Sequence, residues 1–405
     1  MLLARLFERL VSVGRLTLID ASGRTHRFEG RPGPASTIRL KDPVLHRKLV
    51  LRPRLYLPEA YMDGTLVIEE GSLYDLMDLL ARNLEALPAG FLVRVTNGFT
   101  TLLRRLHQVN PRGRARRNAA HHYDLSERLY ELFLDPDRQY SCAYFTLPEE
   151  DLETAQKSKK RHIAAKLLLS PGQKVLDIGC GWGGLALTLA QDYGVEVTGL
   201  TLSAEQLKVA ERRALKAGLS ERVRFFLRDY REEEGVYDRI VSVGMFEHVG
   251  VNHYGEFFAK VKSLLPADGI ALLHAIGRMS GPGDTNPWLR KYIFPGGYSP
   301  ALSEVIRAVE RMRLWITDIE VLRLHYAETL KAWRRRFAEN RAELKALYDE
   351  RFCRMWEMFL VSSEVTFRRH DHMVFQMQLA KAVDSVPLTR DYMFDGERAA
   401  AREAA

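Results

Sequence analysis

The sequence contains few cysteines and no long apolar run. Three cysteines occur in 405 residues, and their spacing matches neither a metal site nor a disulfide scaffold: Cys142, Cys180 and Cys353. We therefore expect a reducing compartment, the cytoplasm. No uninterrupted apolar run reaches the roughly 18 residues that a membrane-spanning helix needs, because charged residues interrupt even the apolar N-terminus. The protein is expected to be soluble or attached to a membrane surface.

Acidic residues are absent from residues 100–123, a stretch that carries six arginines: Arg104, Arg105, Arg112, Arg114, Arg116 and Arg117. We interpret residues 106–118 as a basic linker between two domains, for which a solvated tether and a membrane contact are equally good explanations. The formal net charge of +8 favours an anionic partner, and anionic lipid attracts each nearby basic residue by about 1 kcal/mol. The linker lacks the aromatic residues that stack on bases. An anionic phospholipid surface is therefore the predicted partner, and nucleic acid is not.

Residues 1–105 contain no glycine-rich loop. Leucines and Phe7 at spacings of three and four predict an amphipathic first helix, for which packing on its own domain is favoured over contact with lipid. A hairpin is expected over residues 16–28, a strand over 66–68, and helix starts at Asp42-Pro43 and Ser72. We predict a small α+β domain with an accessory, lipid-binding role.

The stretch Lys174–Leu185, K-V-L-D-I-G-C-G-W-G-G-L, has the pattern of a buried strand, a tight turn and a helix. Its glycines fit G-x-G-x-x-G, in which the missing Cβ atoms let the backbone approach a ligand: Gly179, Gly181 and Gly184. This spacing alone does not separate a dinucleotide from S-adenosylmethionine. Asp177, at the end of the strand, suits a cationic cofactor better than a pyrophosphate.

Further strands alternate with helices after residue 119. They are predicted over residues 195–202, 223–228, 239–244 and 269–276, with later strands over 319–324 and 373–379. This alternation predicts an α/β fold with a doubly wound, mostly parallel sheet over residues 119–405. The strand after the glycine turn lacks the acidic residue that usually binds ribose, so Thr201 and Gln206 would substitute. Gln206 also completes an S-x-x-Q capping box with Ser203, and both roles are compatible.

Six segments together carry a resemblance to a known family. They are His122-Tyr123-Asp124, Tyr140-Ser141-Cys142-Ala143-Tyr144, Asp177–Gly184, Glu247-His248-Val249-Gly250, Tyr292–Gly297 and Leu324-His325-Tyr326-Ala327. In this order and spacing they resemble the cyclopropane-fatty-acyl-phospholipid synthases, the class that includes the mycolic acid cyclopropane synthases. The resemblance covers the second domain, and the first domain resembles the N-terminal module of the full-length bacterial enzymes.

The resemblance implies a class I, Rossmann-like S-adenosylmethionine-dependent methyltransferase, with S-adenosylmethionine as co-substrate. The resemblance implies that S-adenosylmethionine contacts Tyr140, Ser141, Gly179, Gly181, Thr201 and Gln206. It places Asp177 at the methionine end and Asp229 or Tyr230 near the adenine. It also implies a homodimer at the inner face of the cell membrane. The flexible segment Pro295-Gly296-Gly297 would act as a lid over an acyl channel.

The implied reaction transfers a methylene group to a cis double bond of an unsaturated phospholipid acyl chain. A carbocation arises that water would trap, so the site must be dry and aromatic. Aromatic residues available to line it are Tyr140, Tyr144, Phe246, Tyr292, Phe294 and Tyr326. In the family, a bound bicarbonate removes the proton. Its matched ligands here are the side chains of Glu247, His274 and Tyr326 and backbone groups of Cys142 and Ile276.

Each of these residues also has a structural interpretation. His274 lies in an apolar run, where a satisfied core histidine is the ordinary case, and Tyr326 at a helix start would simply pack. An unpaired buried Glu247 is costly, which favours function. Cys142 has no paired base nearby in the sequence, which disfavours a nucleophile.

Two alternatives to cyclopropanation stay open at this point. The same fold and cofactor would serve a fatty-acid C-methyltransferase, in which the carbocation loses a different proton or undergoes a hydride shift and gives a methyl- or methylene-branched chain. An N-methyltransferase for small amines is a weaker version. The second alternative is a non-enzymatic lipid-binding protein, which the joint presence of all the site residues disfavours.

Overall fold

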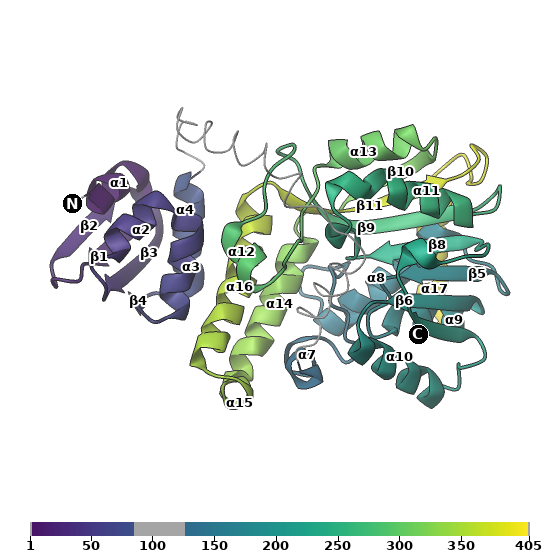
Figure 1. Cartoon of the computed structure of the whole chain (residues 1–405), viewed down its shortest axis with the longest axis horizontal. Helices are drawn as coiled ribbons and strands as arrows, with labels where there is room; N and C mark the ends of the chain where they lie inside the picture. The colour runs from purple at the N-terminus through teal and green to yellow at the C-terminus, as the bar shows by residue number, and fades with distance from the viewer. Residues whose placement is uncertain (1, 85–125, 404–405) are drawn as a thin grey trace. The chain divides into compact units, whose positions relative to one another are not determined.

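The computed structural model describes residues 2–84 and 126–403, so the predicted linker over 106–118 and the His122-Tyr123-Asp124 segment lie outside the described residues (Figure 1). The chain divides into two compact units. The smaller unit combines the described part of Met1–Leu102 with Asp284–Pro295 and Ala327–Asp371. The larger unit holds the rest of the described chain. Two segments from the predicted second domain thus group with the N-terminal residues.

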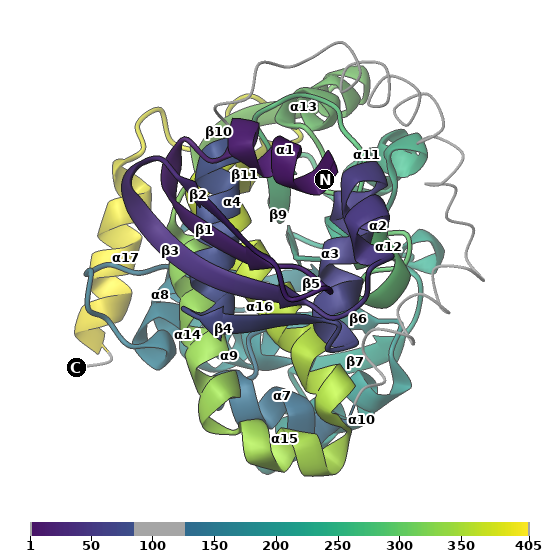
Figure 2. The same cartoon turned by 90° about the vertical axis from the view of Figure 1, so that its left-hand side faces the viewer.

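The N-terminal part of the smaller unit is an α+β module with a four-stranded sheet in the order β2-β1-β3-β4 (Figure 2). Its elements are α1 (Leu2–Leu10), β1 (Val13–Ile19), β2 (Thr25–Glu29), β3 (Arg31–Leu40), α2 (Leu45–Leu51), α3 (Pro53–Met62), β4 (Leu66–Glu70) and α4 (Leu73–Leu84). The predicted hairpin is confirmed as the antiparallel pair β1–β2. Strand β3 was not predicted, because its first residues include Pro32 and Pro34, which normally argue against a strand.

Helices from the later segments complete this unit. They are α12 (Pro287–Tyr292), α14 (His325–Glu339) from Ala327 onward, α15 (Arg341–Leu347) and α16 (Glu350–Arg369). Trp288 Nε1 on α12 donates to Met62 Sδ at 3.0 Å, and Arg369 Nε on α16 pairs with Asp78 Oδ1 at 2.6 Å. Tyr292, the last residue of α12, donates its hydroxyl hydrogen to Glu59 Oε1 at 2.9 Å. The module therefore makes hydrogen bonds and an ion pair with these helices.

The larger unit contains a seven-stranded sheet in the order β10-β11-β9-β8-β5-β6-β7 (Figure 1). The strands are β5 (Lys174–Ile178), β6 (Glu196–Thr201), β7 (Val223–Leu227), β8 (Arg239–Val243), β9 (Ile270–Arg278), β10 (Trp315–Val321) and β11 (His372–Ala380). Neighbours from β9 to β7 are parallel, and β11 is antiparallel to both β9 and β10. The predicted doubly wound, mostly parallel sheet is confirmed. Strand β10 ends three residues earlier than the predicted strand.

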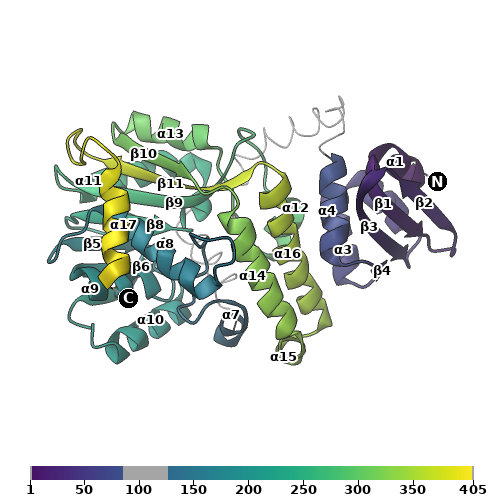
Figure 3. The ribbon, with the colours of Figure 1, turned by 180° about the vertical axis from the view of Figure 1, so that it is seen from behind.

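Helices cover both faces of this sheet, so its central strands β5, β8 and β9 are buried on both sides. Their bounds are α7 (Glu127–Phe133), α8 (Leu152–Leu167), α9 (Gly184–Tyr193), α10 (Ala204–Lys216), α11 (Tyr254–Leu264), α13 (Leu302–Arg311) and α17 (Asp391–Glu403). Helices α11 and α13 share one apolar cluster with Leu273 and Ala275 of β9, whereas α8, α9 and α10 share another with Leu272. Figure 3 shows α8 and α17 in front of the sheet. Because strand side chains alternate between faces, His274 lies on the same face as Leu272.

Candidate active site

The candidate site lies where the chain order reverses in the large sheet. Strand β5 has β6 on one side and β8 on the other, and ligands of such sheets bind at the carboxyl ends of the strands at this point. Gly179 follows β5 with φ +87°, and a Cβ on it would lie 2.7 Å from the Cβ of Met245, which follows β8. Glycine is therefore required by both backbone conformation and the close approach of these strand ends.

The predicted strand, turn and helix of the glycine-rich segment are confirmed as β5, a turn and α9. Gly183, with φ +81°, is the N-cap of α9. Gly181 has φ +54°, and a Cβ on it would meet no atom within 4 Å. The turn thus combines a tight backbone with open space beside Gly181, as a ligand approaching the backbone requires.

Asp177 is buried at the end of β5, and its Oδ2 atom has no hydrogen-bond partner among the described residues. Burial raises the pKa of its carboxyl to about 7, against the opposing effect of Lys159. An unpaired buried carboxyl is costly. A cationic group placed there would favour its ionised form.

The segment that contains Tyr140 and Ser141 is held by α8. Lys159 Nζ donates to Gln139 Oε1 at 2.6 Å and to Ser141 Oγ at 2.8 Å, and Gln156 Nε2 donates to the Ser141 carbonyl at 3.0 Å. Lys159 is fully buried, which lowers its pKa to about 8.

The sequence analysis missed the role of α8. Gln156, Lys159 and Lys166 lie at helical spacing on its buried side. A helix that must pack on a sheet yet lacks an apolar stripe was the available signal.

Thr201 and Gln206 lie together at the carboxyl end of β6, as the ribose assignment requires. Thr201 Oγ1 donates to Gln206 Oε1 at 2.9 Å and accepts from Ser203 N at 3.2 Å. Ser203 is the N-cap of α10, with its Oγ accepting from Gln206 N. The Ser203 half of the predicted capping box is therefore confirmed, and the ribose contact stays a prediction.

The two residues predicted near the adenine are both engaged within the protein. The Asp229 carboxylate pairs with the Arg231 guanidinium, with 2.8 Å between Oδ1 and Nε. The ring of Tyr230 packs against that of Phe257 at 5.3 Å between centroids. Their role in binding adenine stays a prediction.

Glu247 is positioned by the end of strand β8. The last residue of β8, Val243, is in register with His274, and the next pairing on that side of β9 is a single bridge between Arg278 and Ala301. The Ile276 N–H donates instead to Glu247 Oε1 at 2.6 Å. Glu247 Oε2 has no partner among the described residues, and burial raises the pKa of this carboxyl to about 7, opposed by the Ile276 N–H.

His274 has one satisfied and one unsatisfied ring nitrogen. Its Nδ1 lies 3.2 Å from Gln376 Nε2, while its Nε2 is buried with no partner in the described part of the chain. Burial, with the nearby charges of Lys159, Lys166 and His162, lowers its pKa well below the usual value, so the ring is neutral. We call Asp177, Glu247 and His274 the unpartnered set.

The structure joins the segment around Cys142 to the start of α14. Phe145 N donates to His325 Nδ1 at 3.0 Å, and the rings of Tyr144 and His325 stack at 4.8 Å. Tyr326 is the next residue and is half-buried. Cys142 is buried, and its Sγ lies 3.3 Å from the Ala143 carbonyl oxygen.

The aromatic residues predicted to line the site have different surroundings. The Tyr140 ring packs edge-on against Tyr130 at 5.5 Å. Phe246 is fully buried and stacks on Tyr254 at 4.4 Å, which makes it a core residue. Phe294 belongs to the smaller unit and packs against Phe359 there.

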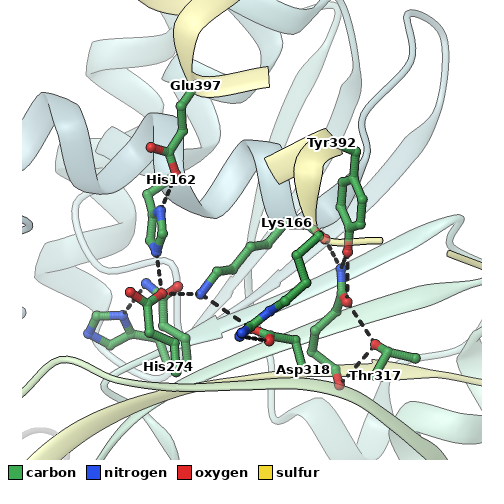
Figure 4. A network of polar contacts seen from close by, with 11 residues as sticks. His162, Lys166, His274, Thr317, Asp318, Tyr392 and Glu397 are labelled. Carbon is green, nitrogen blue, oxygen red and sulfur yellow. Dashed lines mark hydrogen bonds and ion pairs between the residues drawn. The ribbon is translucent and has the colours of Figure 1, made fainter. Parts of the chain in front are cut away.

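A second polar cluster lies on the His274 face of the sheet (Figure 4). Lys166 pairs with Glu320, whose Oε2 also lies 2.6 Å from His162 Nε2, and His162 Nδ1 contacts Glu397 of α17. Burial alone would raise the pKa of Glu320, but the contacts with His162 and Lys166 lower it to about 2. Asp318 lies 3.8 Å from Lys166 Nζ. We call these five residues the ion-pair network.

No helix in residues 2–84 and 126–403 is long and apolar enough to cross a membrane. No group of three or more histidine, cysteine, aspartate or glutamate side chains in those ranges has the arrangement of a metal site.

Comparisons with known proteins agree with this geometry. Residues 111–377 match the family model of mycolic acid cyclopropane synthetase. The chain is 39% identical over 352 residues to the cyclopropane-fatty-acyl-phospholipid synthase of Escherichia coli K12, covering 86% of this chain and 88% of that protein. It is 35% identical over 390 residues to the tuberculostearic acid methyltransferase of Mycobacterium tuberculosis, covering 93% and 90%.

Solved structures give the same relationship. The crystal structure of mycolic acid cyclopropane synthase CmaA1 complexed with SAH and CTAB matches with a TM-score of 0.62 and 33% identity, covering 67% of this chain and 99% of that one. The chain therefore belongs to the mycolic acid cyclopropane synthetase family of S-adenosylmethionine-dependent methyltransferases.

Proposed function

We propose that the protein transfers a methylene group from S-adenosylmethionine to a cis double bond of an unsaturated phospholipid acyl chain, forming a cyclopropane ring. The unpartnered set carries this proposal. Three buried polar side chains on or next to adjacent strands each keep one atom without a partner among the described residues. Such groups are rare in folded proteins unless they serve a ligand. The name of the Escherichia coli relative supports the same reaction.

The residues around the glycine turn fit S-adenosylmethionine as co-substrate. The buried Asp177 offers an unpaired oxygen to the ammonium of the methionine end. Gly181 has open space beside it. A relative bound to SAH supports this choice of ligand.

The proposed reaction accounts for every bond, electron pair and proton without a metal or an oxidant. The alkene electron pair forms a bond to the sulfonium methyl carbon, and the S–C bond breaks to leave S-adenosylhomocysteine. The positive charge then lies on the other alkene carbon. Loss of a proton from the new methyl group releases the C–H electron pair, which closes the ring. Bicarbonate, when bound, would supply the base that accepts this proton.

The residues available to hold bicarbonate fit a small anion with one hydroxyl. Neutral His274 has a buried Nε2 that offers a hydrogen bond, and Glu247 Oε2 accepts one from a hydroxyl. Tyr326 and the backbone of Cys142 are the further proposed ligands. The Ile276 N–H already donates to Glu247, so its contribution is to orient that carboxylate.

A fatty-acid C-methyltransferase is the second candidate. The name of the Mycobacterium tuberculosis relative supports it, and that relative covers as much of this chain as the synthases do. It differs in the fate of the carbocation, which loses a different proton or first undergoes a hydride shift, so the same buried residues serve both outcomes.

Isotope labelling separates these outcomes. Cells that express the protein are fed methionine with a deuterated methyl group, and their fatty acids are analysed by mass spectrometry. A cyclopropane product that retains two deuterons supports the proposal. Three deuterons in a branched chain would assign the C-methyltransferase instead, and unlabelled lipids would contradict both.

We further propose that the basic linker binds anionic phospholipid at the inner face of the cell membrane. The formal net charge of +8 supports this. Replacing Arg114, Arg116 and Arg117 with Gln should weaken binding to anionic vesicles and reduce its salt dependence. Unchanged vesicle binding would contradict the proposal. A homodimer remains a prediction, checked by sedimentation.

A further inference from the structure

His274 and Gln376 face each other across two paired strands. His274 of β9 is in register with Gln376 of β11, and Gln376 is in turn in register with Glu320 of β10. His274 is 2% exposed and Gln376 is fully buried. The two strands are hydrogen-bonded neighbours, so the relative position of the two side chains is set by the sheet. Figure 4 shows His274 beside the ion-pair network.

The contact between these side chains determines which ring nitrogen carries the proton. Gln376 Nε2 lies 3.2 Å from His274 Nδ1. In this orientation of the Gln376 amide, in which Oε1 has no partner among the described residues, Nε2 can only donate, so Nδ1 presents its lone pair. A neutral imidazole has one N–H, which is then on Nε2.

Burial, together with nearby cationic groups, lowers the pKa of His274 and keeps the ring neutral. The cationic groups that act on the ring are Lys159, Lys166 and His162, and the acidic one is Glu320. Glu320 is held by Lys166 and His162. Within the described chain, Nδ1 therefore has Gln376 as its hydrogen-bond partner.

We propose that Gln376 is a positioning residue that holds the proton of His274 on Nε2, so that the ring donates a hydrogen bond to an anionic oxygen in the site. This inference rests on the proposed function in one respect, namely that the anion is bicarbonate. Without Gln376 the ring would exchange between two tautomers, and one of them would place a lone pair against the anion.

The buried Gln378 provides a matched control. It lies two residues along β11, on the same face, and is also fully buried. Its Nε2 donates to the Lys166 carbonyl and lies 2.8 Å from the Tyr392 hydroxyl, so its contacts lie away from His274. Gln376→Leu and Gln378→Leu therefore remove equal side chains from similar surroundings, and only the first removes the donor to Nδ1.

The first measurement is the tautomer of His274 in the intact wild-type protein. Long-range ¹H–¹⁵N correlation spectra of protein labelled on histidine distinguish the two tautomers, and the loss of one signal set in His274→Asn assigns the residue. We expect the Nε2–H pattern. In Gln376→Glu, whose carboxylate only accepts, the Nδ1–H pattern should appear, while Gln378→Leu should match wild type. An Nδ1–H pattern in wild type would overturn the inference.

The second measurement is turnover as a function of added bicarbonate in CO₂-depleted buffer. The bicarbonate concentration for half-maximal rate should rise at least tenfold in Gln376→Leu and less than twofold in Gln378→Leu. Equal effects in the two variants would overturn the positioning role. Wild-type turnover that does not depend on bicarbonate would contradict the proposed base, and the tautomer spectrum would still test the Gln376 contact by itself.

Discussion

Two groups of buried polar side chains in the larger unit differ in whether their hydrogen bonds are complete. In the ion-pair network, each charged group faces an opposite charge, and the contacts link α8, β10 and α17. In the unpartnered set, each side chain keeps one polar atom without a partner among the described residues. Burial without a partner is costly. We infer that the network contributes stability and that the unpartnered set serves ligands, a division that single substitutions can test.

The largest effect is expected for Glu247→Gln. The amide oxygen can still accept from the Ile276 N–H, so the local fold should persist. The second oxygen becomes an NH₂ donor, which no longer accepts a hydrogen bond from bicarbonate. We expect turnover to fall roughly 1,000-fold, within the range for loss of acid–base catalysis. Single-turnover kinetics measure this loss.

The control for Glu247→Gln is the affinity for S-adenosylhomocysteine, measured by calorimetry. It should stay within about threefold of wild type, because Glu247 lies outside the glycine turn and its proposed role is in proton transfer. Parallel loss of affinity and turnover would indicate that the substitution disturbs the fold.

In the ion-pair network, Glu320→Gln should mainly reduce stability. It leaves the Lys166 ammonium, which is 1% exposed, without its nearest carboxylate. Breaking a buried pair typically costs about 3–5 kcal/mol, and because Glu320 is itself 29% exposed we expect about 2–3 kcal/mol. Urea unfolding measures this change.

The matched control in this case is Glu205→Gln, which breaks the exposed pair with Lys208. Both side chains of that pair are more than half exposed, so a change below about 0.5 kcal/mol is expected. If Glu320→Gln is as neutral as this control, the ion-pair network is not a stabilising element and the comparison fails.

Asp177→Asn should weaken cofactor binding and remove its pH dependence. The pKa of Asp177 is raised to about 7 by burial. A cationic ligand favours the ionised form, so wild-type affinity should rise by up to about tenfold per pH unit below pH 7 and level off above it. The variant should bind roughly 10- to 100-fold more weakly at pH 8, as expected for loss of a charged hydrogen bond.

Calorimetric titration of both proteins with S-adenosylmethionine between pH 5.5 and pH 8.5 gives the two affinity profiles. Parallel profiles would mean that Asp177 does not contact the cationic end of the ligand. It would then act only in organising the glycine turn.

The sequence predicted the sheet better than the surroundings of the site. Buried strands such as β5 and β9 are apolar on both faces and end at glycine or polar residues, which local patterns report well. Strand β3 was not predicted because its prolines oppose local strand formation. Its pairing with β1 is parallel and set by the tertiary fold.

The partners of the site residues depended on contacts that no local pattern contains. Asp177 and Glu247 were selected from their positions at strand ends and from the family resemblance. The role of Gln376 depends on the register between β9 and β11, 102 residues apart in the chain. The polar side of α8 can be assigned a role only when the tertiary structure shows that its side chains hold the segment with Ser141.

The smallest predicted effect concerns the pH dependence of stability in the ligand-free protein. The folded pKa of Asp177, about 7, exceeds its unfolded value of 3.8. The folded state therefore binds more protons between these values, and the contribution of Asp177 to stability declines as pH rises through 7. Buried His248, with a pKa lowered by burial to about 4, acts in the opposite direction. The pH dependence of wild-type stability therefore does not by itself reveal the contribution of Asp177.

The difference between Asp177→Asn and wild type isolates this contribution. The variant should gain about 1 kcal/mol relative to wild type between pH 6 and pH 8, because only the wild type must ionise a buried carboxyl. Urea unfolding of both proteins at the two pH values measures the gain. Glu205→Gln should show no such gain, because both side chains of its pair with Lys208 are exposed. A pH-independent difference for Asp177→Asn would place this carboxyl with the satisfied groups of the ion-pair network.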